Sequence, residues 1–319
     1  MYNRTREAVK LVNEYPLMDL KTDYAFKQLF GQPRTEDILI AFLNALLKRD
    51  GDERIESVEF VNTEISPVRK EGKSMRLDVH VRTGRGERIN IEIQVGSQEE
   101  MGKRTLIYWA GIFNPQAHSG MKYEDLKQAI TINIVNFRCF HSTERYHTAY
   151  HVYEDDDRFR LSDVLEIHFV EMPKFRQARK NRLEEAAHNP LERWLLLLDA
   201  SKNTRIRKEL EVIAMADTTM EHALNVWGEI SQDEAKQQAY HLRRIAIMDE
   251  ISKVHDAEKK GLEKGLRRGR QEGKLEGKLE GKLEAAKAML EDGLDVGRVS
   301  RLTGIPVEEL ERLQEDHHG

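Results

Sequence analysis

The sequence predicts a mixed α/β domain followed by an all-helical C-terminal extension. Three observations predict this class. Between residues 19 and 175, apolar residues recur first at helical spacing, then at strand spacing, and then in further helix and strand patterns. After Pro173 the alternation of β-branched residues almost disappears. Residues 180–255 then show helical periodicity, so the chain changes architecture near residue 175.

The α/β part begins with helical spacing over residues 19–49, which Gly31–Pro33 divides into two predicted helices. Strands are predicted next over 57–65, 75–82 and 88–95. The sequence Thr83-Gly84-Arg85-Gly86 is typical of a turn, so the last two strands are predicted to form a hairpin. The remaining predicted elements are a helix over 97–113 and strands over 129–137, 147–153 and 166–171.

The extension contains a glycine repeat. From residue 261 to 284 glycine recurs every four residues, and the last three units read Gly-Lys-Leu-Glu. Each glycine inside a helix costs about 1 kcal/mol relative to alanine. The segment is therefore either a flexible linker or a helix whose glycines lie against another helix. We predict four parts: an α/β catalytic domain at 1–178, a helical extension at 179–255, the glycine-repeat linker or helix at 256–284, and a small helical tail at 285–319.

Composition narrows the class of protein. The chain has 51 basic and 56 acidic residues, a net charge of −5, which argues against coating nucleic acid by bulk charge but allows a local basic groove. The single Cys139 excludes an intrachain disulfide and a cysteine-based zinc cluster. The first residues lack the apolar core of a signal peptide, and the run Trp194–Leu198 is too short to span a bilayer. We predict a cytoplasmic protein without a membrane partner.

The predicted hairpin carries two acids in phase. Asp78 lies on the even-numbered face of its strand, opposite the apolar odd positions, and Glu92 and Gln94 lie on the even face of the next strand. If these faces coincide, Asp78 lies near Glu92, because cross-strand partners are about 5 Å apart. Two carboxylates beside an amide suit Mg²⁺, with Mn²⁺ as the alternative. The other interpretation is a solvated hairpin face, since alternation does not determine the register.

The hairpin also resembles a known family. Arg76-Leu77-Asp78-Val79 followed by Ile91-Glu92-Ile93-Gln94 resembles the core of the PD-(D/E)XK nuclease superfamily, and more closely the Rpn family of recombination-promoting nucleases and putative transposases. The resemblance runs from about residue 18 to 290. It includes residues 23–31, Asn62-Thr63-Glu64, Lys73, Arg104 and Tyr108. It implies a restriction-endonuclease-like mixed sheet flanked by helices.

The resemblance also implies roles for individual residues. Asp78 and Glu92 are the implied metal-binding acids, with the Ile93 carbonyl as a backbone ligand. Gln94 stands where the superfamily usually has a lysine, and a neutral amide can orient water but cannot supply that cation. Lys73 or Lys27 is our hypothesis for the missing charge.

Four further residues have two interpretations each. Asp23 resembles the acid that the first helix contributes to the site, or it is a helix N-terminal acid following Thr22. Glu64 is a second such acid or part of a solvated strand edge. Arg104 and Tyr108, four residues apart on one helical face, contact phosphate or simply pack.

The sequence therefore predicts a Mg²⁺-dependent DNA endonuclease associated with recombination or mobile elements. Two rivals are a non-catalytic DNA-binding protein that retained the fold, and an interaction protein acting through residues 180–319. Residues 251–290 carry 11 Lys and Arg against 7 Asp and Glu. This local surplus is compatible with DNA contact, although a linker or a homodimer contact is favoured for that segment.

Overall fold

The computed structural model describes residues 16–65, 75–96, 100–180 and 182–315. The chain divides into two compact units, Met1–Ile247 and Met248–Gly319. The four parts expected from the sequence stay a prediction, because compactness alone does not say which segments fold independently. No helix within the described ranges is both long enough and apolar enough to cross a membrane.

Helices dominate the described chain, and the first of them begins and ends where the sequence has helix signals. Thr22 caps the first helix by accepting a hydrogen bond from the Ala25 amide, and Gly31 ends it. The helices before the tail are α2 (Asp23–Phe30), α3 (Glu36–Leu47), α4 (Met101–Phe113), α5 (Met172–Arg179), α6 (Leu183–His188), α7 (Pro190–Asp199), α8 (Thr204–Ala214), α9 (Thr218–Gln232) and α10 (Glu234–Glu291). Short 3₁₀ turns occur at Pro33–Thr35, Gly51–Glu53, Asn114–Gln116, Tyr123–Asp125 and Ala200–Lys202.

The sheet of the first unit is mixed. Its strands are β1 (Val58–Phe60), β4 (Val79–Thr83), β5 (Arg88–Gln94), β6 (Ala129–Val135), β8 (Leu165–Glu171) and β7 (His147–Tyr150), in that spatial order. The central pairs β5–β6 and β6–β8 are parallel, and the outer pairs are antiparallel. A separate two-stranded sheet joins β2 (Glu64–Ile65) to β3 (Met75–Arg76). The mixed α/β class with a helical extension is therefore confirmed.

The strand predicted over residues 75–82 is wrong as a single strand, because the chain breaks at Leu77 and Asp78. The Leu77 amide donates a hydrogen bond to the Thr63 carbonyl (2.8 Å). The Asp78 amide donates to the carboxylate of Glu92 (3.3 Å). The first bond continues the pairing of β2 with β3, whereas the second joins the Asp78 amide to a side chain, so β3 and β4 pair with different strands. Asp78 consequently lies where the chain passes from one sheet to the other.

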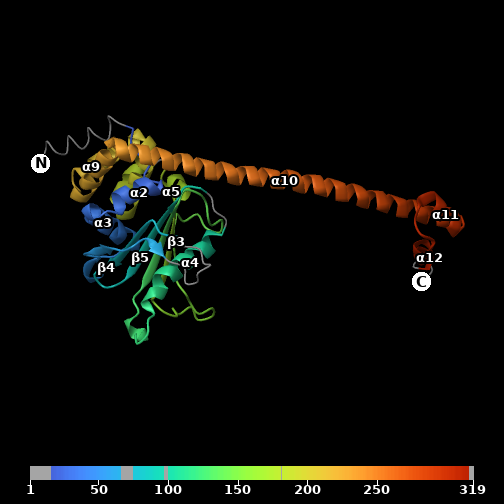
Figure 1. Ribbon diagram of the computed structural model, residues 1–319, viewed down its shortest axis with the longest axis horizontal. Coiled ribbons are helices and arrows are strands. Elements are labelled where there is room, and N and C mark those ends of the chain that lie inside the picture. Colours follow the sequence, from blue (N-terminus) through green and yellow to red (C-terminus); the bar gives the residue numbers. More distant parts are fainter. Residues whose placement is uncertain (1–15, 66–74, 97–99, 181, 316–319) are drawn as a thin grey trace. The chain divides into compact units, whose positions relative to one another are not determined.

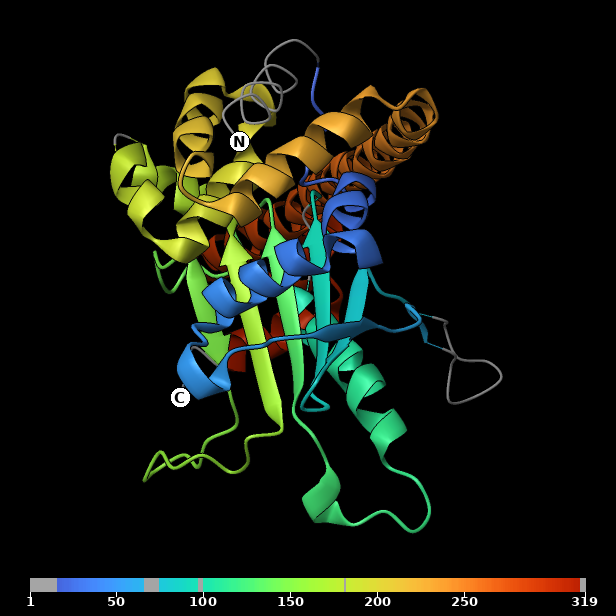
Figure 2. The same cartoon turned by 90° about the vertical axis from the view of Figure 1, so that its left-hand side faces the viewer.

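Helices cover both faces of the six-stranded sheet (Figure 2). On one face Ile89, Ile91 and Ile93 join the main hydrophobic core, to which α2, α3 and α7–α9 also contribute. The indole of Trp227 in α9 donates to the Met18 carbonyl (2.9 Å), so the helices that follow the sheet share its core. Helix α4 packs on β5 and β6 from the other face. The central strands are consequently buried on both sides.

The second unit contains the C-terminal part of α10 with α11 (Val296–Thr303) and α12 (Val307–Glu315). Asp295 caps α11 by accepting from two backbone amides. Gly304 ends it with a φ of 72°, a left-handed conformation that favours glycine. The small core consists of Ala286, Val299, Ile305 and Leu310. The described part of the tail is therefore helical, with a turn at Gly304 between α11 and α12.

Candidate active site

Asp78 and Glu92 lie side by side where β4 meets β5. The antiparallel register pairs Val79 with Ile91, which places Asp78 opposite Glu92. The backbone joins the two carboxylates: the Asp78 amide donates to Glu92 Oε1 (3.3 Å), and the Ile93 amide donates to Asp78 Oδ2 (3.0 Å). The Asp78 and Glu92 residues are only 9% and 1% exposed. The structure thus brings together the two acids that the sequence singled out.

A lysine from the first helix reaches this pair. Lys27 Nζ in α2 lies 2.8 Å from Asp78 Oδ1. Lys73, the other candidate cation, lies outside the described residues. Arg104 in α4 donates from Nε to the Tyr108 hydroxyl (2.6 Å), and its positive charge opposes the rise in the Glu92 pKa. Among the described residues, the positive charge near the acids therefore comes from α2 and α4, which both contact β5.

Within the described part of the chain, Lys27 is the cation that contacts the two acids, so negative charge exceeds positive charge there. Burial raises the pKa of Asp78, although Lys27 and the Ile93 amide oppose that rise. Burial and the neighbouring Asp78 raise the pKa of Glu92 to about 8. A carboxylic acid with this pKa holds its proton at neutral pH unless a further cation is present. An added positive charge would therefore stabilise the ionised form of the two carboxylates.

Asn90 supports Glu92 from within β5. Its Nδ2 donates to Glu92 Oε1 (3.1 Å), and this contact defines the orientation of the amide. Asn90 pairs with His80 on one side and with Thr131 on the other, and all three side chains are buried. His80 Nε2, Asn90 Oδ1 and Thr131 Oγ1 find no hydrogen-bond partner among the described residues. These three atoms can therefore form hydrogen bonds with ordered water beside the acids.

Helix α4 is the reason that this face is not solvated. Thr105 in α4 accepts a hydrogen bond from Asn133 Nδ2 (2.8 Å), and Asn133 pairs with Glu92 in the parallel register of β5 and β6. The interpretation of the even-numbered positions as a solvated hairpin face is therefore wrong. Beneath this helix the charge of Asp78 raises the pKa of Glu92, whereas water and salt would screen two acids on an exposed face.

A comparison with protein families matches residues 20–257 to the PD-(D/E)XK nuclease family transposases. The chain belongs to this family. The match confirms the resemblance carried by the segments around Asp78 and Glu92. Comparisons with curated proteins and with solved structures find no match.

The structure also describes three other positions to which the resemblance gives a role, namely Gln94, Asp23 and Glu64. Gln94 follows Glu92 by two residues in β5, on the same side of the strand. Asp23 lies at the start of α2, where Arg243 Nε approaches both of its carboxylate oxygens (2.7 and 2.9 Å). The charge of Asp23 still contributes to raising the pKa of Asp78. Glu64 is an exposed residue of β2.

The donor set fits a divalent cation that prefers oxygen ligands. Both hydrogen bonds that described residues donate to Glu92 end on Oε1, which leaves Oε2 available to a further partner. The described chain contains no group of three or more His, Cys, Asp or Glu side chains that could hold a metal. A cation at this site would therefore rest on Asp78, Glu92 and neutral oxygens such as the Ile93 carbonyl and water.

Sequence reasoning missed the part that β6 contributes to the site. Thr131 and Asn133 lie two residues apart in a strand that is otherwise apolar, so they share one face. Two polar side chains at that spacing in a central strand indicate a buried polar layer. The sequence displays this spacing, but it does not show that β6 lies beside β5.

Proposed function

We propose that this protein is a metal-dependent endonuclease that hydrolyses phosphodiester bonds of DNA in recombination or in the movement of mobile elements. The observation that carries the proposal is the buried Asp78–Glu92 pair, bound together through backbone amides and short of positive charge. Membership of a nuclease family supports the same class of reaction.

Asp78 and Glu92, with the Ile93 carbonyl, would hold Mg²⁺ or Mn²⁺. Such a cation activates water and neutralises the charge that develops on the phosphate. Loading it requires Glu92 to lose its proton, so the proposal expects cation affinity to rise as the pH approaches 8.

The chain itself contributes orientation and fixed charge. The Gln94 amide can both donate to and accept from water, so it orients the attacking molecule without taking its proton. Lys27 places a positive charge beside Asp78, where the neutral Gln94 supplies none. Asp23, held by Arg243, acts on the pair only through its charge in this arrangement. Lys73 stays an alternative source of this positive side-chain charge.

Plasmid nicking in Mg²⁺, Mn²⁺ or EDTA tests the proposal. Asp78→Ala and Glu92→Ala are expected to lower the cleavage rate by more than about 100-fold, because losing a ligand costs more than losing a residue that supports one. Lys27→Ala is expected to cut slowly, with partial recovery in Lys27→Arg. Lys103→Ala, an exposed lysine paired with Glu100, is the control and is expected to cut normally.

Cleavage that survives in both acid variants would contradict the assignment of the site. An unchanged cleavage rate in Lys27→Ala would show that Lys27 does not supply the required positive charge. The rate of Lys73→Ala would then be measured. Metal-independent DNA binding without any cleavage would favour the second candidate, a DNA-binding protein that retained the nuclease fold. The observation that favours this candidate is Gln94 in the place of the usual lysine.

A further inference from the structure

Helix α10 carries six exposed basic residues on one side. These are Lys260, Lys264, Arg267, Arg270, Lys274 and Lys278, here called the basic row. At about 100° per residue, a four-residue step advances by about 40° and a three-residue step returns by about 60°. The two three-residue steps, at Arg267 and Arg270, cancel the drift of the four-residue repeat. Lys278 therefore lies at the same angle as Lys260, and the row stays within an arc of about 120°.

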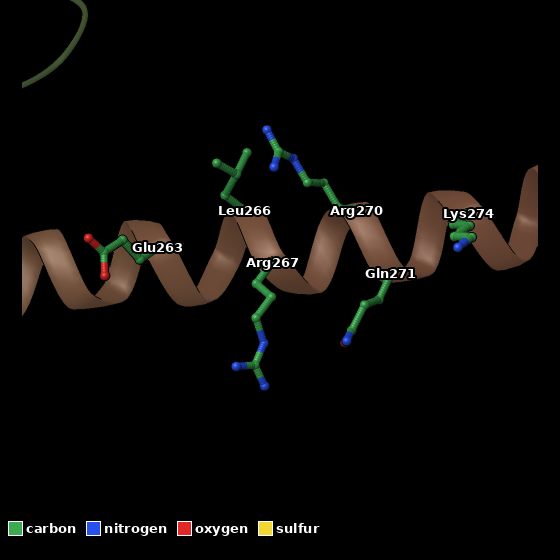
Figure 3. Close-up of a pocket in the computed structure, with 6 residues that line it drawn as sticks. All are labelled: Glu263, Leu266, Arg267, Arg270, Gln271 and Lys274. Atoms are coloured by element: carbon green, nitrogen blue, oxygen red, sulfur yellow. The ribbon is translucent and has the colours of Figure 1, made fainter.

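The basic row is unpaired within the described part of the chain, where none of its six side chains forms an ion pair. Arg268, which lies outside this arc, is paired instead with Glu272 (2.7 Å). Glu272, Glu276 and Glu280 fall on the opposite side of the helix, so acids and bases are separated by face. Glu263 is the acid that shares the arc. Figure 3 shows Arg267 and Arg270 extending from the helix in different directions, and the residues that line the pocket at this place all belong to α10.

We propose that the basic row binds the phosphate backbone of duplex DNA. It presents about one cation per helical turn, or six over about 27 Å. Duplex DNA carries about one negative charge per 1.7 Å of its axis, so a straight row of this length meets a continuous anionic surface. Such contacts position DNA and carry no base specificity. The inference rests on the proposed function, because the DNA bound is the substrate to be cut.

The opposite face of α10 argues against an anionic membrane as the partner. An interfacial helix buries an apolar face beneath its basic one. Here the far side of the row carries Glu272, Glu276 and Glu280, which a membrane surface would repel.

The test measures binding of the full chain to a short labelled DNA duplex by fluorescence anisotropy, in EDTA, over a range of KCl concentrations. The variant Arg267→Gln, Arg270→Gln, Lys274→Gln removes half of the row and keeps good helix formers. Each phosphate contact contributes about 0.9 to the slope of log K against log salt, so the slope is expected to become shallower by about 2 to 3. The control Lys287→Gln, Arg301→Gln, Arg312→Gln makes the same charge change at exposed positions off the row and is expected to keep the wild-type slope.

The outcomes separate this inference from the proposed function. If the wild type binds DNA and the row variant shows the control's slope and affinity, the basic row is overturned while the nuclease proposal stands. If the wild type does not bind DNA at all, both fail. Binding of phosphatidylserine vesicles, lost in the row variant and without DNA binding, also overturns the inference. Retained nicking by the row variant at low salt supports it, because the row lies on a different element from Asp78 and Glu92.

Discussion

The pKa of each buried acid in the site depends on the hydrogen-bond donors and positive charges that contact its carboxylate. Asp78 has a lysine and a backbone amide, whereas Glu92 has one side-chain amide, from Asn90, and one backbone amide. Burial beside the Asp78 carboxylate raises the pKa of Glu92 to about 8. Asn90 is the side-chain contact that opposes this rise.

Replacing Asn90 with alanine is expected to weaken Mn²⁺ binding by about 10- to 100-fold, the usual cost of losing a residue that supports a ligand. Titration calorimetry measures the affinity. Asn133→Ala is the matched control, because Asn133 is equally buried but donates to Thr105 and to the His168 carbonyl instead of to an acid. Equal losses in both variants would mean that the effect comes from disturbing the polar layer as a whole.

A second titrating group, the half-buried His147, lies on the edge strand β7. His147 Nε2 lies 2.9 Å from His168 Nδ1, and His168 in turn contacts Glu166. Burial and the charge of His168 lower the pKa of His147 from 6.5 to about 4. In the unfolded chain His147 therefore takes up a proton as the pH falls below 6.5, whereas in the folded protein it does so only near pH 4.

The stability contributed by His147 is therefore complete above pH 6.5 and is lost as the pH falls through this window. Urea unfolding at pH 7.5 and pH 5 is expected to show a smaller loss of stability in His147→Gln than in the wild type. His118→Gln, at an exposed histidine, is the control. An identical loss in His147→Gln and the wild type would contradict the low pKa.

Helix α10 contains six glycines, a residue that disfavours the helical conformation. Its glycines at 261, 265, 269, 273, 277 and 281 lie within the helix, and an added Cβ at any of them would meet no atom within 4 Å. Nothing within the described chain therefore requires glycine there. A homodimer contact that uses this stripe stays a prediction.

Gly269→Ala with Gly273→Ala tests both possibilities. Each substitution is expected to stabilise the helix by about 0.5 to 1 kcal/mol, because alanine loses less backbone entropy. Circular dichroism during a thermal melt measures this change. If light scattering instead shows a wild-type dimer that the variant lacks, the glycines lie against a second copy and the expectation fails.

Across the first unit, the hydrophobic core runs from Met18 to Tyr240 and includes the sheet and the helices that follow it. Lys21 Nζ reaches the Leu198 carbonyl (3.0 Å), and the Met18 amide donates to Ser231. Segments distant in sequence therefore stabilise the helix that carries Lys27.

A chain ending at residue 178 is consequently expected to lose cooperative unfolding, because it exposes the core face that α7 and α9 cover. A chain ending at residue 247 retains that core and is expected to unfold in one transition. Chemical denaturation followed by tryptophan fluorescence compares the two, with the full chain as the control. Cooperative unfolding of the shorter chain would show that the part before residue 178 folds by itself.

Several local features of this protein follow from the spacing of residues along the chain. Local periodicity predicted the helices around Phe26 and Phe42, the hairpin of β4 and β5, and the face on which Asp78 and Glu92 lie. These features depend on residues close in the chain, whose spacing a single sequence displays.

Only the tertiary structure decided the environment of those acids. The break at Leu77–Asp78 depends on the Thr63 carbonyl and the Glu92 carboxylate, and the covering of the site depends on α4. The choice of Lys27 as the contacting cation depends on how α2 packs against the sheet. Periodicity reports which side of an element is apolar, but it does not report which other element covers the polar side. Burial is what turns two ordinary acids into a coupled pair, and burial is a property of the assembled fold.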